Sequence, residues 1–384
     1  MAQHDVESFA HSLSAKLASR SRHVCVFLGA GASRAAGLPD VAALEALVLA
    51  GLAPAQRQQL TKQLAGRTLE QALSRVRRIA ALVEGTDAID GLTHTEAMDL
   101  DGSVCREIVA ALDVDAADIT SALRFAAWAA RADYHLPLEV FTVNYDLVVE
   151  QALEKLGVPY FDGFVGILAA RFRTELVEAE PAQGDAWMPS FLVRLWKLHG
   201  SVNWRWDDGA RREVLRLGSA VAAGAAAAIY PSDAKYEESR RVPFVVLQDR
   251  LRRALYHPET LVLITGYSFG DEHLNEVLFD AAQRRPRTEF VAFCYDEPPD
   301  QLTERAQRTP NLQVTGPGSA VLGGQLSPWS TPADAPPDLW DSGGFGLGSF
   351  ANLAAFLARS SPPEGDLEQR LALLLATASR SASA

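Results

Sequence analysis

Short runs of apolar residues alternate along this chain with segments in which apolar residues recur at helical spacing. The runs lie at residues 23–28, 138–143, 191–198, 261–265, 289–295 and 312–315. Runs of this length without polar alternation are typical of strands buried on both faces of a parallel sheet. Helices are expected between most of them, at 146–156, 244–255, 272–284 and 301–308. The alternation predicts an α/β fold with a Rossmann-like, doubly wound parallel sheet.

The remaining segments predict additions to this sheet. Residues 6–20 carry apolar positions on one helical face. The block at about 41–135 is helical and too long for a simple crossover, so we expect a helical insertion between the first and second strands. Residues 1–315 would form one domain around the sheet. Residues 316–348, rich in glycine, proline and serine, predict a loose connector, and residues 349–384 predict a C-terminal helical tail.

Composition narrows the classes of function. The chain has 36 Lys and Arg against 48 Asp and Glu, a net charge of -12, so tight direct binding of nucleic acid is not expected. Three scattered cysteines are too few for a disulfide framework or a four-cysteine zinc site. The N-terminus lacks the apolar core of a signal peptide, and no stretch of about 20 apolar residues is present to span a membrane. We therefore expect a cytoplasmic protein.

A glycine-rich loop, Gly29-Ala30-Gly31-Ala-Ser33, follows the first predicted strand. Glycines there allow the backbone to approach a pyrophosphate, whose charge is favourable beside the N–H groups that open a helix. Arg34 replaces the usual third glycine of the dinucleotide fingerprint, so a tight structural turn remains an alternative. The loop lacks the GK[ST] ending of a phosphate-loop ATPase.

Polar residues end two further predicted strands. Asn144 and Asp146 follow the second strand, and His199-Gly200 follows the run 191–198. In an open parallel sheet the carboxyl ends of the strands line the ligand crevice. Asn144 and Asp146 would then face a ribose, and a neutral His199 imidazole would accept a proton. The alternatives are an ordinary helix N-cap for the first pair and a structural histidine for His199.

The sequence Gly266-Tyr-Ser268-Phe-Gly270 matches the GxSxG nucleophile elbow of hydrolases. Those enzymes need a histidine well downstream of the serine. The only histidine after Ser268 is His273, at the start of the same predicted helix. We therefore favour a nucleotide contact for Ser268 over a nucleophilic role.

The motifs GAGAS…GLP, TVNYD, KLHGS and GYSFGDEH, in this order from about Val24 to Val314, resemble the SIR2 superfamily. The form GYSFGDEHLN is more similar to bacterial SIR2-like proteins of antiphage systems than to protein-deacylating sirtuins. The resemblance implies that Asn144 and Asp146 contact the nicotinamide ribose of NAD and that His199 is the catalytic histidine. It implies that Gly29, Ala30, Gly31 and Ser33 hold the pyrophosphate, that Gly266 and Ser268 contact phosphate or adenosine ribose, and that Asp296 holds an adenosine-ribose hydroxyl.

Two features separate the chain from deacylating sirtuins. No cysteine lies between residues 106 and 293, where those enzymes carry a zinc module, and Asp40-Val-Ala-Ala43 replaces their Phe-Arg pair. We therefore expect an NAD glycohydrolase that forms nicotinamide and ADP-ribose without zinc or another metal. NAD-dependent protein deacylation and a non-catalytic NAD or ADP-ribose sensor remain alternatives. The resemblance also implies an antiphage effector that is controlled by homo-oligomerisation and by a HerA-type ATPase partner.

Overall fold

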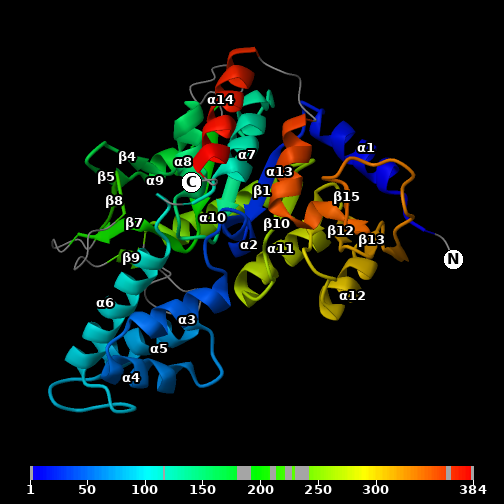
Figure 1. The fold of residues 1–384 in the computed structure, drawn as a ribbon. Coiled ribbons are helices and arrows are strands. Elements are labelled where there is room, and N and C mark those ends of the chain that lie inside the picture. The colour runs from blue at the N-terminus through cyan, green and yellow to red at the C-terminus, as the bar shows by residue number, and fades with distance from the viewer. Residues whose placement is uncertain are drawn as a thin grey trace.

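A nine-stranded sheet forms the centre of the molecule (Figure 1). The computed structural model describes residues 3–115, 117–179, 192–207, 213–220, 227–229, 242–359 and 365–381. Across the sheet the strands are β14 (Gln325–Pro328), β13 (Ser319–Leu322), β12 (Leu312–Thr315), β11 (Glu289–Phe293), β10 (Leu261–Thr265), β1 (Val24–Leu28), β2 (Glu139–Thr142), β6 (Val193–Lys197) and β3 (Tyr160–Phe161). Every neighbouring pair from β12 to β3 is parallel, which confirms the predicted α/β fold class.

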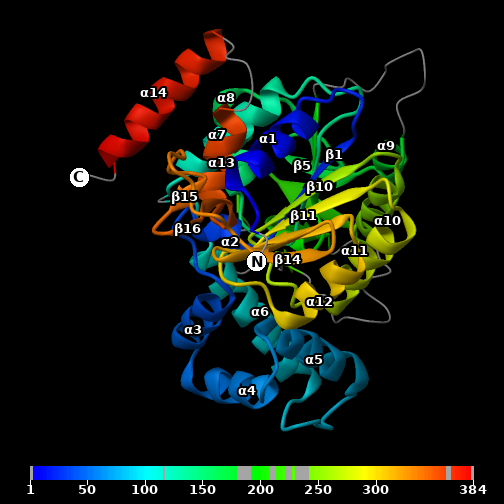
Figure 2. The ribbon, with the colours of Figure 1, turned by 90° about the vertical axis from the view of Figure 1, so that its right-hand side faces the viewer.

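Helices cover both faces of this sheet (Figure 2). One face carries α1 (Val6–Leu17), α7 (Thr120–Arg131), α8 (Val148–Leu156) and α13 (Phe350–Arg359). The other carries α10 (Phe244–Tyr256), α11 (Glu272–Arg284) and α12 (Asp300–Arg308). Because both faces are buried, every residue of β1 and β10 is buried. This explains why the strands read as continuous apolar runs.

The helices between β1 and β2 divide into two groups. After the five-residue α2 (Ala30–Arg34), the helices α3 (Val41–Gly51), α4 (Pro54–Leu64), α5 (Leu69–Leu82) and α6 (His94–Ala111) share a core of their own and extend away from the sheet. α7 instead buries its apolar side, with Phe125 and Trp128, in the core that covers the sheet. The predicted insertion therefore consists of a separate four-helix unit and one helix that belongs to the sheet layer.

The prediction of a loose connector at 316–348 is wrong. β13 and β14 form an antiparallel hairpin that extends the central sheet, and β15 (Trp340–Asp341) pairs with β16 (Gly344–Phe345). Gly323 and Gly324 turn this first hairpin with φ values of 58° and 82°, a backbone region that favours glycine. Trp329 and Phe345 stack on each other and contact Phe9 of α1. The glycines and prolines thus serve tight turns between short, packed strands.

A second sheet, not predicted from the sequence, lies beside β6. Its strands, in order, are β4 (Phe164–Val165), β5 (Ala169–Phe172), β8 (Val214–Leu217), β7 (Gly200–Trp206) and β9 (Ala227–Ile229). A short helix, α9 (Thr174–Val177), follows β5, and Phe191 of the predicted apolar run lies outside the described residues. β7 begins directly after His199, so this sheet borders the predicted site.

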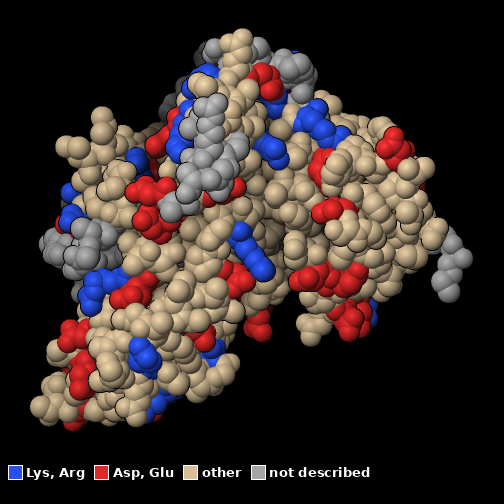
Figure 3. Space-filling view, viewed as in Figure 1, with Lys and Arg blue, Asp and Glu red and all other residues tan. Residues whose placement is uncertain are grey.

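The chain ends in a helix that only partly contacts the body. α14 (Gly365–Ser381) follows α13 and is held near its start by an ion pair between Glu368 and Arg131 of α7. Within the described residues, no helix has the length and apolar character that crossing a bilayer requires. On the face shown in Figure 3, acidic and basic side chains are interspersed among neutral ones.

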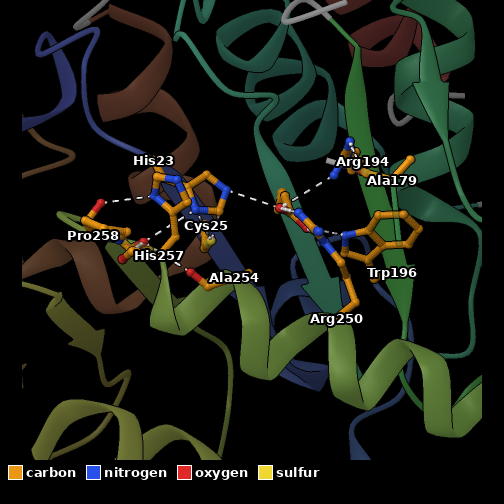
Figure 4. A network of polar contacts seen from close by, with 11 residues as sticks. His23, Cys25, Ala179, Arg194, Trp196, Arg250, Ala254, His257 and Pro258 are labelled. Carbon is orange, nitrogen blue, oxygen red and sulfur yellow. Dashed lines mark hydrogen bonds and ion pairs between the residues drawn. The ribbon is translucent and has the colours of Figure 1, made fainter. Parts of the chain in front are cut away.

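The amino ends of the central strands enclose a buried ionic cluster around Glu139, the first residue of β2. Figure 4 shows its partners His23, Arg194, Trp196 and Arg250. Arg250 of α10 donates to both carboxylate oxygens of Glu139, and Trp196 Nε1 donates at 2.7 Å. His23 Nε2 lies 3.2 Å from the same carboxylate, and Arg194 lies at 4.0 Å. Burial favours the neutral acid, but Arg250 and His23 outweigh it and hold the pKa of Glu139 well below its ordinary value. The cluster fastens β1, β2, β6 and α10 at the edge opposite the predicted site.

Replacing Glu139 by Gln is expected to destabilise the fold by about 3 kcal/mol at neutral pH, because the arginine charges lose their buried counter-ion. Glu139 has a lowered folded-state pKa, so its contribution is full above its ordinary value of 4.5 and is lost as the pH falls below it. Denaturant unfolding of wild type and Glu139→Gln between about pH 7 and about pH 3 tests both points. The wild type should lose more stability than the variant over this range.

The matched control is Glu289→Gln, at the start of β11. Glu289 also pairs with two cations, Lys16 at 2.5 Å and Arg22 at 2.8 Å, but its side chain is 20% exposed. We expect a cost of about 1 kcal/mol or less for this more exposed network. Equal losses in the two variants would contradict the assignment of the Glu139 cluster as the stronger fastening.

Candidate functional site

The predicted site residues lie at the carboxyl edge of the central sheet. β1 lies between β2 and β10, and the chain passes from β1 to one side of the sheet before it returns to β10 on the other side. Such a reversal of strand order is the point at which open α/β sheets form their ligand crevice. The loops after β1, β2, β6 and β10 all reach this edge. The fold therefore supplies the location that the sequence predicted.

The two glycine loops at this edge pack backbone against backbone. Gly31 N donates to Gly266 O at 2.8 Å, and Gly29 N donates to Thr265 O at 3.0 Å. A Cβ on Gly31 would lie 2.7 Å from Gly266 Cα, and one on Gly266, whose φ is 63°, would lie 2.4 Å from Ala32 N. Close approach of the two loops thus requires glycine at both positions. The prediction that these glycines admit a pyrophosphate stays a prediction.

Asn144, Ser33 and Asp146 form a hydrogen-bonded chain between β1 and β2. The Asn144 amide nitrogen donates to Gly29 O at 2.9 Å and to Ser33 Oγ at 2.8 Å. Ser33 Oγ donates in turn to Asp146 Oδ2 at 2.5 Å. Asp146 Oδ1 accepts from Val148 N at 3.1 Å and so supports the start of α8. The structure brings together three residues that the sequence predicted separately, and it gives Ser33 and Asp146 contacts within the protein.

These hydrogen bonds fix which atom of the Asn144 amide is left without a partner. Both amide hydrogens are used, because the nitrogen has two acceptors at hydrogen-bond distance. The reversed amide would place two oxygens against each other at Gly29, so the assignment rests on the network. Asn144 Oδ1 is buried and accepts no hydrogen bond from the described residues. A buried acceptor left in this way costs about 1–3 kcal/mol, which favours a ligand or a water as its donor.

His199 follows β6, the strand that pairs with β2 before Asn144. Thr142 of β2 pairs with Lys197 of β6, and Asn144 and His199 each follow two residues later. Adjacent strands are about 5 Å apart, so the two side chains leave neighbouring strand ends at the same level. His199 is 5% exposed, and its Nδ1 has no hydrogen-bond partner within the described part of the chain. An amide oxygen and an imidazole nitrogen are therefore both available at this edge.

Asp271, which the sequence analysis did not single out, lies against His199. It is the N-cap of α11, where its Oδ1 accepts from His273 N at 2.9 Å and from Leu274 N at 3.2 Å. Its Oδ2 lies 3.3 Å from His199 Nε2. The two atoms lie within ion-pair distance but do not form a hydrogen bond in this structure. The only signal in the sequence was an ordinary helix cap, which gives no indication of a partner across the crevice.

The start of α11 is fastened to the loop that precedes it. Tyr267 donates to Asn275 Oδ1 at 3.0 Å and lies 3.3 Å from Asp271 O. Burial, and then the charge of Asp271, raise the pKa of Tyr267 well above its ordinary value, so its hydroxyl stays protonated. The position of Asp271 is thus fixed by the hydrogen bond from Tyr267 to its backbone oxygen and by the two capping bonds to its side chain.

Other predicted site residues lie at the same edge without joining this network. Ser268, after β10, and Asp296, after β11, are exposed, and Ala30 is half-buried in the first glycine loop. The structure shows no hydrogen bond from the side chains of Ser268 and Asp296 to the described residues of the site. Their assignment to nucleotide phosphate and ribose stays a prediction. Among the described residues, no group of three His, Cys, Asp or Glu side chains is arranged to hold a metal ion.

Part of the chain matches a model of a known protein family. Residues 138–315 match the family model of the SIR2-like domain, which supports assignment to the SIR2-like family. The matched region begins at β2 and ends at β12, so it contains Asn144, His199 and Asp271 but not Gly29 or Ser33. The hydrogen bonds of Asn144 continue the site into the preceding segment. No curated protein matches the chain.

Gly31→Ala is expected to destabilise the protein by about 2–3 kcal/mol, because its Cβ would push apart the two loops that it joins. Gly270→Ala, in the same loop as Gly266, is the control. Its Cβ would meet only the hydroxyl of the exposed Ser268, at 3.3 Å, so the variant should fold with nearly wild-type stability. Denaturant unfolding of both variants checks the difference. Equal stability would show that the loop contact is not required.

Proposed function

We propose that the chain is an NAD glycohydrolase, which cleaves NAD to nicotinamide and ADP-ribose. The observation that carries the proposal is the buried oxygen of Asn144, which has no hydrogen-bond partner among the described residues and follows the strand next to the one that leads to His199. SIR2-like domains use NAD, and residues 138–315 match such a domain. A hydrogen-bond acceptor and a base at the carboxyl ends of adjacent strands, where open α/β sheets bind dinucleotides, would serve a sugar carbon that is attacked by water.

The reaction breaks the bond between the ribose C1′ and the nicotinamide nitrogen. The bonding electrons leave with nicotinamide, which departs as a neutral molecule, and positive charge develops on the sugar as in an oxocarbenium ion. A water oxygen then bonds to C1′ and loses one proton. The site must therefore orient a water or a ribose hydroxyl, accept a proton and tolerate positive charge.

The residues divide these tasks by their contacts. Asn144 Oδ1 accepts from the attacking water or from a ribose hydroxyl, because the amide nitrogen is already occupied. His199 accepts the proton, and Asp271 orients its ring and stabilises the imidazolium that forms. Ser33 and Asp146 position Asn144 through their hydrogen-bonded chain. No metal enters this scheme.

The biological setting is part of the proposal. The similarity of GYSFGDEHLN to SIR2-like proteins of antiphage systems supports an effector that depletes NAD in the cytoplasm of an infected cell. Uncontrolled NAD loss would harm the host, so activity has to be restrained. We propose control by homo-oligomerisation and by a HerA-type ATPase acting in trans.

Incubation of the purified protein with NAD, followed by chromatography, should show equal amounts of nicotinamide and ADP-ribose without any acylated peptide. Asn144→Ala and His199→Ala should each lower kcat by at least about 100-fold, the scale of a lost general acid–base or positioning group. Asp271→Asn keeps a residue that caps helices well, and should lower kcat by about 10-fold through loss of the charge beside His199.

His11→Ala is the control for the histidine variant, because His11 is exposed on α1, and it should leave kcat unchanged. Melting temperatures of all the variants separate loss of catalysis from loss of folding. NAD consumption that depends on an acylated peptide would identify a deacylase instead. Tight nucleotide binding without nicotinamide release, unaffected by His199→Ala, would identify a sensor.

A further inference from the structure

A buried lysine lies two residues before His199. Lys197, the last residue of β6, is 3% exposed, and its ammonium group donates to the backbone oxygen of Asp146. It lies 3.4 Å from Tyr145 O and 2.9 Å from the carboxylate of Glu150 in α8. The lysine thus spans from the strand that carries His199 to the turn that carries Asn144.

The backbone oxygens of Tyr145 and Asp146, in the turn after β2, accept hydrogen bonds from the segment around His199. Tyr145 O accepts from Val202 N at 2.9 Å and from Ser201 Oγ at 3.2 Å, in addition to its contact with Lys197. Buried backbone oxygens need such donors, and donors that carry charge form the stronger bonds. Residues 197–202 therefore carry His199 and also donate hydrogen bonds to the turn that contains Asn144.

We propose that Lys197 is a positioning residue that sets the location of Asn144 relative to His199. This inference rests on the proposed function, because it concerns the geometry of that reaction. Lys197 does not touch the crevice and acts through the backbone of residues 145 and 146. A displacement of about 1 Å between reacting groups lowers a rate by about 100-fold. Hydrogen bonds that fix the position of this turn therefore affect kcat directly.

The chemistry of the contacts explains why a lysine occupies this position. Two carbonyl oxygens and a carboxylate surround its nitrogen, and an ammonium group offers three rotatable donors to match them. The planar fork of arginine fits paired oxygens in one plane, which is a different arrangement. Well-packed apolar residues often replace a buried ion pair without loss of stability. Stability alone therefore does not account for the charge.

The competing explanation is that Lys197 only anchors α8 through Glu150. Burial raises the pKa of Glu150, while Lys197 acts in the opposite direction, so the carboxyl group is sensitive to its partner. Glu150→Gln removes this charge but leaves both carbonyl contacts of Lys197 in place. The double variant Lys197→Met with Glu150→Gln removes the grip on the turn without leaving a buried charge unpaired. Comparison of the two variants distinguishes a role of Lys197 in positioning the turn after β2 from a role in anchoring α8.

The experiment measures three quantities in each variant: kcat and KM for nicotinamide release, the melting temperature, and deuterium exchange of the amides of residues 143–148. For Lys197→Met/Glu150→Gln we expect a fall in kcat of about 100-fold with KM nearly unchanged. Its melting temperature should stay within about 3 °C of wild type. Exchange at 143–148 should be faster. Glu150→Gln alone should keep kcat within about threefold of wild type, a difference of less than about 1 kcal/mol.

Each outcome decides the inference. Wild-type kcat and exchange in the double variant would overturn it, as would an equal loss of kcat in Glu150→Gln. If the double variant does not fold, Ser201→Ala removes one donor to Tyr145 O and should lower kcat with KM unchanged; an unchanged kcat would then overturn the inference.

If the wild type releases no nicotinamide, the proposed function fails. Deuterium exchange then decides the inference: faster exchange in the variant supports the grip, and unchanged exchange overturns it.

Discussion

The site depends on a ring of contacts that joins four strand ends at one edge of the sheet. Gly31 bonds to Gly266, which links β1 to β10, and Asn144 bonds to Gly29, which links β2 to β1. Leu198 N donates to Thr142 O at 2.8 Å, which links β6 to β2, and the contact between His199 and Asp271 returns to the loop after β10. Parallel pairing brings the carboxyl ends of these strands to the same edge of the sheet. The close contact between Gly31 and Gly266 then allows the loops after β1 and β10 to pack against each other, which completes the ring of contacts.

The two edges of the same sheet differ in how their polar groups are satisfied. At the amino edge, Glu139 has partners on three sides and forms a closed ionic cluster. At the carboxyl edge, Asn144 Oδ1 and His199 Nδ1 lack partners within the described residues. Polar groups that are satisfied stabilise a fold, whereas an unsatisfied buried group is completed by a water, an ion or a ligand. The helical insertion reaches the second edge, because Tyr145 lies in its core and donates to Glu70 of α5 at 3.0 Å. The insertion is thus packed directly against the turn of Asn144.

The sequence predicted the central strands well because burial on both faces leaves a strong signal in apolar runs such as 261–265. It also predicted that Asn144 and His199 lie at the carboxyl ends of strands, because this location follows from topology, whereas their roles stay predictions. The strands at 316–348 and all strands of the second sheet except β7 have two to four residues, too few positions to show a period, so these elements were missed. Asp271 and Lys197 were missed for another reason. Their roles come from partners far away in the sequence, and locally they are an ordinary helix cap and a lysine in a strand.

The contacts of residue 144 also explain why an amide, and not a carboxylate, suits this position. The nitrogen must donate to Gly29 O and Ser33 Oγ, and an ionised aspartate would set a negative oxygen against the Gly29 carbonyl. Ser33 would no longer have a donor from this side, although it would still donate to Asp146. Asparagine alone satisfies both neighbours and keeps one neutral acceptor for the crevice. In the proposed reaction, a neutral acceptor orients a water by its dipole without competing for the proton that the imidazole would take. The roles proposed for Asn144 and His199 are thus consistent with the hydrogen bonds that hold Asn144.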